Sequence, residues 1–319
     1  MFDLKIKAVK ILLSMISGFG SQRKLIILIY HRVLNSPDFM NPHQISVEDF
    51  DWQMKLLATH FNVLSLSDAL EKLKANELPP CAVCITFDDG YADNYLNALP
   101  ILKRYDLPAT FFIVSGFLNE DRMWNDDIVE TIRLYESSIL DLTALGLGSY
   151  DIDTLNKKSQ TAKKLITHLK YLPFAERAEK CKLITNLTSN LPNNLMLTDK
   201  QLKYLSDESG MEIGGHSVNH PILTKIKPLE SKHEISDCKI QLEKIIQKPV
   251  RFFAYPNGKF DVDFNKQHAL FAKECGYEAA LSTNWGCVSQ KSDLFFLPRF
   301  TPWDKTPTKF MLRMASIYW

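Results

Sequence analysis

The chain has 319 residues, a formal net charge of +1, 45% hydrophobic residues and 24% charged residues. These values describe a soluble globular protein that is long enough to bury a sizeable core. The near-neutral charge and the lack of any block of like charges give no electrostatic reason to expect nucleic acid as a partner.

The N-terminal segment carries three lysines before the apolar run at 11–19. That run is too short to span a bilayer, which takes about 20 apolar residues. We predict that residues 1–24 form a retained amphipathic helix, which packs on the domain or rests on a membrane surface. The expected location is cytoplasmic, with peripheral contact at the inner membrane. Export through a short N-terminal signal is the alternative.

Beyond residue 25 the pattern alternates between short apolar runs and amphipathic segments. The apolar runs predict strands at 26–33, 61–66, 82–87, 108–117, 211–217, 251–256, 277–283 and 294–300. The amphipathic segments predict helices at 47–61, 67–75, 90–105, 198–209, 228–247, 264–276 and 306–318. Repeated βα units of this kind imply a parallel sheet or a barrel for the domain at 25–319.

Residues from about 119 to 197 interrupt this alternation. The stretch has helical periodicity, few strand runs and many Leu, Lys, Asn and Glu residues, so we predict a helical insertion. Asn125, Asp126 and Asp127 have the chemistry of a helix start, where acidic groups cap the helix and offset its dipole. A substrate lid and a membrane-facing cap are both compatible with such an insertion.

Two polar motifs stand where predicted strands end. TFDDG places Asp88 and Asp89 after an apolar strand, and a turn beginning at Gly90 brings both toward one pocket; a helix N-cap is the alternative. GGHSVNH sets His216 and His220 four residues apart, which on a helical turn puts both imidazoles on one face; two loop histidines are the alternative. One carboxylate and two imidazoles make a three-ligand site that leaves a position for water, as catalytic zinc requires. The second carboxylate is then free to act as a base.

The phrases TFDDGY, HSVNH and FAYPNG resemble the motifs of the polysaccharide deacetylase, or NodB-homology, family of carbohydrate esterases. The resemblance covers roughly residues 25–120 and 198–302. YHRV and ITFDDGYADNYLNALPILKRY are most similar to the branch that includes bacterial poly-N-acetylglucosamine deacetylases. The resemblance implies a distorted (β/α) barrel of about seven strands.

The resemblance also implies roles for the motif residues. Asp89, His216 and His220 would bind a divalent metal, with zinc expected first and cobalt or another transition metal as the alternative. Asp88 would be the general base for a metal-activated water. The oxyanion would rest on the metal and on a backbone N–H of the FAYPNG loop, near Asn257.

The chain departs from the family's pattern in two places. The arginine that the family commonly carries in its third motif is absent from the stretch Ala254 to Asn257, and we propose Arg299 in FLPRF as the replacement partner of Asp88. A surface or structural arginine is the alternative. The family's late histidine is also missing. His268 lies in a helical pattern and is expected to be exposed, so His31 is the candidate pocket residue or acid, with a core histidine as the alternative.

Aromatic residues near strand ends suggest a sugar-binding surface, although plain packing is the alternative. Tyr255, Pro256, Asn257 and Trp303 are the predicted substrate contacts, with Trp285 as a further aromatic face. We predict a hydrolase that removes N-acetyl groups from N-acetylhexosamine units of a cell-envelope glycan or a lipid-linked glycan precursor. The alternatives are a deformylase or O-acetyl esterase on a sugar, and a non-catalytic carbohydrate-binding domain on the same fold.

Overall fold

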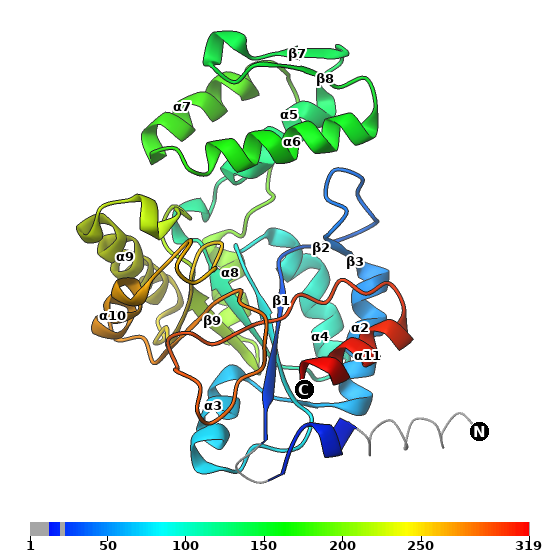
Figure 1. The fold of residues 1–319 in the computed structure, drawn as a ribbon, viewed down its shortest axis with the longest axis vertical. Helices are drawn as coiled ribbons and strands as arrows, with labels where there is room; N and C mark the ends of the chain where they lie inside the picture. Colours follow the sequence, from blue (N-terminus) through cyan, green and yellow to red (C-terminus); the bar gives the residue numbers. More distant parts are fainter. Residues whose placement is uncertain (1–12, 20–22, 319) are drawn as a thin grey trace.

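The computed structural model describes residues 13–19 and 23–318 (Figure 1). Most of the amphipathic helix predicted for residues 1–24 lies outside this part of the chain, although 13–16 are helical. Among the described residues, no helix is both long and apolar enough to cross a membrane.

A seven-stranded parallel sheet forms the scaffold. In spatial order its main strands are β1 (Leu25–Tyr30), β5 (Ala82–Phe87), β6 (Ala109–Ile113), β9 (Met211–Gly215), β10 (Phe252–Ala254) and β11 (Ala279–Leu281), and β4 (Asn62–Val63) pairs with β5. Strands β1, β5, β6, β10 and β11 are buried throughout, as expected when helices cover a parallel sheet. The predicted distorted barrel of about seven strands is therefore confirmed.

The segment at 294–300 forms single bridges instead of the regular strand that the apolar run predicted. Leu297 pairs with Leu281 at the β11 edge, and Phe300 pairs with Leu28 at the β1 edge. The segment therefore lies between the two outermost main strands and links them. Pro298, which has no N–H to donate, stands between the two bridges and explains why no continuous ladder forms there.

Except in the predicted range 90–105, which also contains a π-helical turn, the helices around the sheet begin within two residues of their predicted positions. They are α2 (Val47–His60), α3 (Leu66–Ala75), α4 (Leu99–Arg104), α8 (Asp199–Asp207), α9 (Pro228–Ile246), α10 (Lys266–Glu274) and α11 (Pro307–Ile317). Helix α3 is capped by Ser65, whose side chain accepts the N–H of Asp68, so it begins one residue before the predicted start at 67. The Ser67 hydroxyl donates to Glu212. A π-helical turn at Asn94–Ala98 precedes α4.

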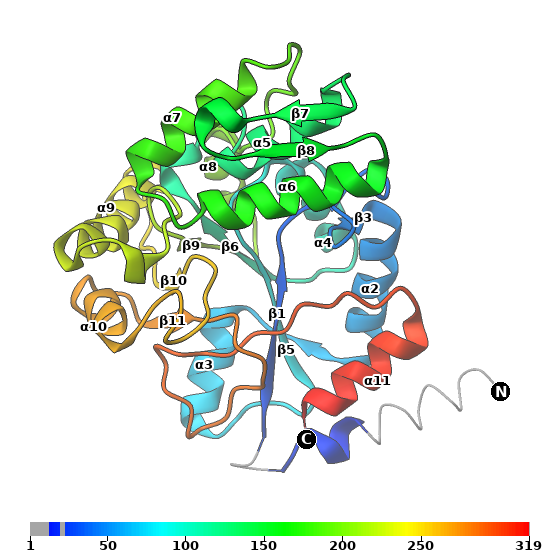
Figure 2. The same cartoon turned by 45° about the horizontal axis from the view of Figure 1, so that its top comes forward.

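The segment that interrupts the βα pattern contains α5 (Trp124–Leu134), β7 (Ile139–Asp141), β8 (Ser149–Asp151), α6 (Leu155–Leu169) and α7 (Phe174–Thr185). It has its own apolar cluster, to which Ile128, Leu165 and Ile184 contribute. As predicted, Asp126 caps α5, because its Oδ2 accepts the N–H of Met123 at 3.2 Å. This insertion lies beyond the carboxyl-terminal edge of the sheet, which is the edge at which β1 ends (Figures 1 and 2). A short parallel pair, β2 (Val33–Leu34) and β3 (Ile45–Ser46), follows β1.

Candidate metal centre

Asp88 and Asp89 leave the carboxyl end of β5 in different directions. The N–H of Asp88 still donates to the carbonyl of Tyr30 on β1 at 2.9 Å, so Asp88 continues the strand. Asp89 has φ +76° and Gly90 has φ +85°, which means that the turn begins at Asp89, one residue earlier than predicted. A non-glycine residue in this region costs about 1–2 kcal/mol. The turn separates the two carboxylates and gives each a different partner.

The HSVNH motif forms a loop, so the predicted helical turn is wrong. Ser217 and His220 have φ values of +65° and +52°, outside the helical region. The loop's N–H groups at Val218 and Asn219 donate to the Glu234 carboxylate, and this pairing replaces the bonds of a helical turn. The His216 and His220 rings still face one another, with their centroids 4.9 Å apart.

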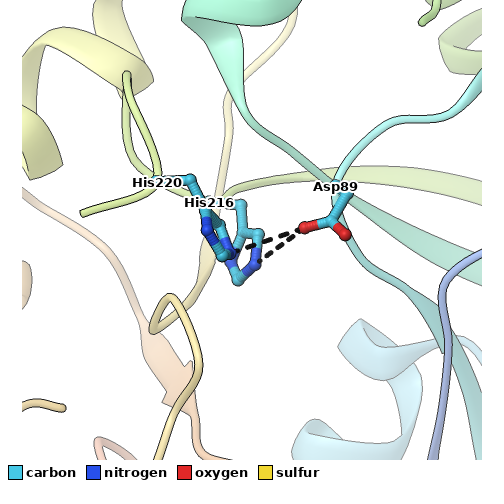
Figure 3. Close-up of side chains that lie close together, drawn as sticks. All are labelled: Asp89, His216 and His220. Carbon is cyan, nitrogen blue, oxygen red and sulfur yellow. Dashed lines mark ion pairs between the residues drawn. The ribbon is translucent and has the colours of Figure 1, made fainter. Parts of the chain in front are cut away.

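Asp89, His216 and His220 converge at the carboxyl-terminal edge of the sheet, here called its mouth. The three residues are called the candidate metal centre (Figure 3). The Oδ1 atom of Asp89 lies 3.5 Å from the Nε2 atom of each histidine, and one ligand atom of each residue lies within 4.8 Å of the others. That Oδ1 atom is buried and has no hydrogen-bond partner. An orphaned carboxylate oxygen facing two imidazoles is costly unless a cation satisfies it.

The two imidazoles present nitrogen lone pairs to the same space. The Nδ1 atom of His216 lies 2.7 Å from the carbonyl of Ala254, and donation there directs Nε2 toward Asp89. Burial lowers the pKa of His220 to about 3, although the charge of Asp89 opposes this. His220 is therefore neutral at pH 7, as a metal ligand must be. Two imidazole nitrogens and one carboxylate oxygen, with further positions open, fit a zinc-like divalent cation.

Asp88 lies against the same space but pairs with Arg299. Its two oxygens accept hydrogen bonds from Nη1 and Nη2 of Arg299, both at 2.7 Å. Arg299 is 1% exposed, and its Nε and Nη1 atoms also donate to the Ser282 carbonyl and the Thr86 hydroxyl. Burial raises the pKa of Asp88, but the charges of Arg299 and His216 and the hydrogen bonds from Arg299 outweigh burial and hold it at about 2.

The remaining predicted residues divide into accessible and buried ones. His31 is half-buried at the end of β1, and Asn257 is half-buried after β10 with φ +58°. Within the described residues the N–H of Asn257 donates no hydrogen bond, so it is free to meet a ligand. Trp303 is 46% exposed and Trp285 is 53% exposed, with their rings 5.5 Å apart.

Three residues that were predicted to be accessible are buried. Tyr255 is fully buried, its ring stacks on Phe264 at 3.7 Å, and its hydroxyl donates to the Phe295 carbonyl, so it offers no face to a sugar. Pro256, which follows it, is also buried. His268 is 3% exposed because its Nδ1 accepts the N–H of Asn265 and completes the capping box of α10.

Three groups near the site were missed or underestimated from the sequence. Glu234 binds the HSVNH loop, but it lies in a helix of mixed charge that gives no signal. Arg177 of the insertion donates to the carbonyl of Asn219. Asp126 was interpreted only as a cap, yet it also accepts from the Tyr91 hydroxyl at 3.1 Å, and burial raises its pKa to about 7.

We predict that the metal-free protein is stabilised by zinc through the candidate metal centre. At a free zinc concentration 100 times the dissociation constant, the unfolding free energy should rise by about 2.7 kcal/mol. His216→Ala should abolish the rise, whereas His233→Ala, at an exposed histidine of α9, should leave it unchanged. Calorimetric melting with and without zinc measures the effect, and an undiminished rise in His216→Ala would exclude this site.

The chain is similar to several known proteins. A family model described as "Polysaccharide deacetylase" matches residues 75–144 and 180–280. The poly-beta-1,6-N-acetyl-D-glucosamine N-deacetylase of Staphylococcus aureus is 30% identical over 154 residues, which are 44% of this chain and 53% of that enzyme. The chain thus matches about half the length of that relative.

Solved structures share the fold. The Streptococcus pyogenes deacetylase PplD, solved in complex with acetate, has a TM-score of 0.62 at 23% identity and covers 92% of this chain and 98% of its own. IcaB from Ammonifex degensii has a TM-score of 0.60 at 19% identity and covers 92% of this chain and 97% of its own. These two similarities establish the architecture.

Proposed function

Since this chain belongs to the polysaccharide deacetylase family, we propose that it is a metal-dependent hydrolase that removes N-acetyl groups from N-acetylhexosamine units of a glycan. One observation carries the proposal: the candidate metal centre and the Asp88–Arg299 pair lie side by side, with Oδ2 of Asp88 3.8 Å from Nε2 of His216. A site that can hold a Lewis-acidic metal therefore lies next to a carboxylate that can act as a base.

Asp89, His216 and His220 would hold the metal, which when bound lowers the pKa of water and polarises a carbonyl. Asp88 accepts the proton of the attacking water, because it is ionised at neutral pH and lies beside the ligands. Arg299 keeps Asp88 in one orientation through its two hydrogen bonds. The free N–H of Asn257 stabilises the developing oxyanion, and His31 gives a proton to the leaving amine.

The substrate proposed here is a polymer or oligomer of N-acetylglucosamine, with a lipid-linked glycan precursor as the second choice. The similarity to the staphylococcal enzyme supports this choice of sugar. Two exposed aromatic residues also support it. Trp303 follows Phe300, and Trp285 follows β11. Both therefore lie at the carboxyl end of the sheet, where Asp88 and His216 also lie. Trp303 forms one wall of a hollow of about 480 Å³ that His43 and Gln53 also line.

Acetate release is the direct test of the proposal. The protein, loaded with zinc or cobalt, is incubated with β-1,6-linked N-acetylglucosamine oligomers, with lipid-linked precursors and with O-acetylated sugars, and acetate and formate are measured separately. Acetate from the oligomers, lost in His216→Ala, supports the proposal. Formate in place of acetate would select a deformylase, and release from O-acetylated sugars alone would select an esterase. A protein that binds metal and glycan but releases no acid would be a binding domain.

Trp303→Ala should raise KM for the oligomers roughly fivefold and leave kcat nearly unchanged. Losing one sugar-stacking face costs on the order of 1 kcal/mol in binding, and the ring does not touch the reacting carbonyl. Tyr204→Ala, at an exposed aromatic residue on α8, serves as the control and should change neither constant. Steady-state kinetics on a tetramer decides the point, and an unchanged KM in Trp303→Ala would remove the proposed platform.

A further inference from the structure

The loop that carries the two histidines, residues 216–220, is here called the ligand loop. On one side it is held by the turn after β6. The N–H of Ser115 donates to the carbonyl of Ser217 at 3.1 Å, and that of Gly116 donates to the carbonyl of Val218 at 2.9 Å. A Cβ atom on Gly116 would lie 2.5 Å from the Val218 carbonyl oxygen, so this close approach requires glycine.

Helix α9 holds the ligand loop from a second direction. The Oε2 atom of Glu234 accepts the N–H groups of Val218 at 2.9 Å and Asn219 at 2.8 Å, and its Oε1 atom accepts the Asn219 side chain at 2.7 Å. Three hydrogen bonds to one carboxylate are charge-assisted and geometrically specific. Together, Glu234 and the β6 turn pair the N–H groups of Val218 and Asn219 and the carbonyls at 217 and 218.

The insertion supplies the third contact. The Nη2 atom of Arg177 on α7 donates to the carbonyl of Asn219 at 3.1 Å. Arg177 is 2% exposed, and its guanidinium lies 4.7 Å from the centroid of the Trp124 ring. Among the described residues no ion pair within 4.0 Å involves Arg177, whose guanidinium contacts the Trp124 and Phe174 rings and donates to the ligand loop. Both views place α7 on the same side of the molecule as α9 (Figures 1 and 2).

The hydrogen bond from Arg177 acts on the peptide group that precedes His220 and so affects the orientation of this ligand. The peptide between Asn219 and His220 is held at both ends: Arg177 binds its carbonyl, and its N–H donates to the Ser217 hydroxyl at 3.0 Å. His220 has φ +52°, a conformation that a residue with a Cβ atom avoids unless its surroundings impose it. Releasing the carbonyl would let this peptide rotate and turn the imidazole away from Asp89.

We propose that Arg177 is a positioning residue of the candidate metal centre, and that the insertion is therefore a working part of the site. Arg177 holds the Asn219–His220 peptide in the orientation that directs Nε2 of His220 toward Asp89. This inference rests on the proposed metal binding. Residue 177 lies between the two segments that the family model matches, so this support comes from a part of the chain outside them.

The test is zinc affinity, measured on the full-length metal-free protein by competition with a chromophoric chelator. In Arg177→Met, which keeps the apolar stem of the side chain but removes the guanidinium, the zinc dissociation constant should rise about 10- to 100-fold. Arg177→Lys, which keeps a charged donor, should recover part of the loss. Lys182→Met, at an exposed position on the same helix, should bind zinc like the wild type. The visible spectrum of the cobalt-loaded protein should change in Arg177→Met only.

The outcomes separate this inference from the proposed function. Equal zinc affinities in the wild type and in Arg177→Met would overturn the role of Arg177 and leave the deacetylase proposal standing. A wild type that binds no zinc or cobalt would overturn both. Should Arg177→Met melt too early for titration, Arg177→Gln and Arg177→Lys take its place. Wild-type affinity in both of these would again overturn the inference.

Discussion

Replacing Asp88 with asparagine is expected to lower kcat about 10²- to 10⁴-fold while zinc still binds. The amide keeps the shape of the side chain but cannot accept a proton from water. Because Asp88 is not a member of the candidate metal centre, the zinc affinity should stay within a few-fold of the wild-type value. Steady-state acetate release and a zinc titration on the same preparation measure the two effects separately.

Asp304→Asn is a matched control for this change, because Asp304 is also buried and paired with an arginine, Arg313, at 2.7 Å. It should lose stability without a comparable fall in kcat. If Asp88→Asn kept wild-type kcat, another group would have to take the proton. If it lost zinc as well as activity, Asp88 would be acting as a ligand.

Arg299→Met should destabilise the metal-free protein by about 3–5 kcal/mol at pH 7, because it leaves the Asp88 carboxylate buried without its partner. The double variant with Asp88→Asn should recover much of this loss, because neither charge then remains. Denaturant unfolding of the wild type, both single variants and the double variant gives the coupling energy. Additive losses in the double variant would mean that the ion pair contributes little.

The pH dependence of the Arg299→Met effect has a definite sign. In the wild type the pKa of Asp88 is lowered from 3.8 to about 2, so the pair contributes stability above pH 4 that is lost as the pH falls toward 2. Without Arg299, burial acts with less opposition and raises this pKa above its usual value. The stability deficit of the variant should therefore be largest at pH 7 and shrink as the solution is acidified. Unfolding curves at pH 7 and pH 4 check this, and a deficit that grows on acidification would contradict it.

Much of the architecture follows from local pattern. Short buried apolar runs alternate with amphipathic segments. The apolar runs form strands and the amphipathic segments form helices, because these elements pair the backbone hydrogen-bonding groups and bury the apolar side chains of each pattern. Parallel strands place their carboxyl ends at one edge of a sheet, so motifs that end different strands meet there. For that reason TFDDG and HSVNH, which are 128 positions apart from Asp88 to His216, were expected at one mouth.

The sequence pattern did not decide how the chain bends within those motifs. The loop that contains the left-handed residues Ser217 and His220 is held by hydrogen bonds from outside the motif. Ser115, Glu234 and Arg177 supply some of them. A local spacing of four residues is equally compatible with a helical turn. Strand-end aromatic residues are similarly ambiguous: packing on Phe264 turned Tyr255 into the core, and nothing in its neighbours along the chain indicated this.

The sequence by itself determined the main strands and helices around the sheet, which polar residues end the strands and which family the motifs resemble. Only the tertiary structure decided the partners of those residues. Arg299 reaches Asp88 because a proline-interrupted segment bridges both outer strands of the sheet. Arg177 reaches the ligand loop because the insertion packs above the mouth. Both contacts depend on how distant segments dock, which is set by the packing of many buried side chains at once and leaves no periodic or local trace.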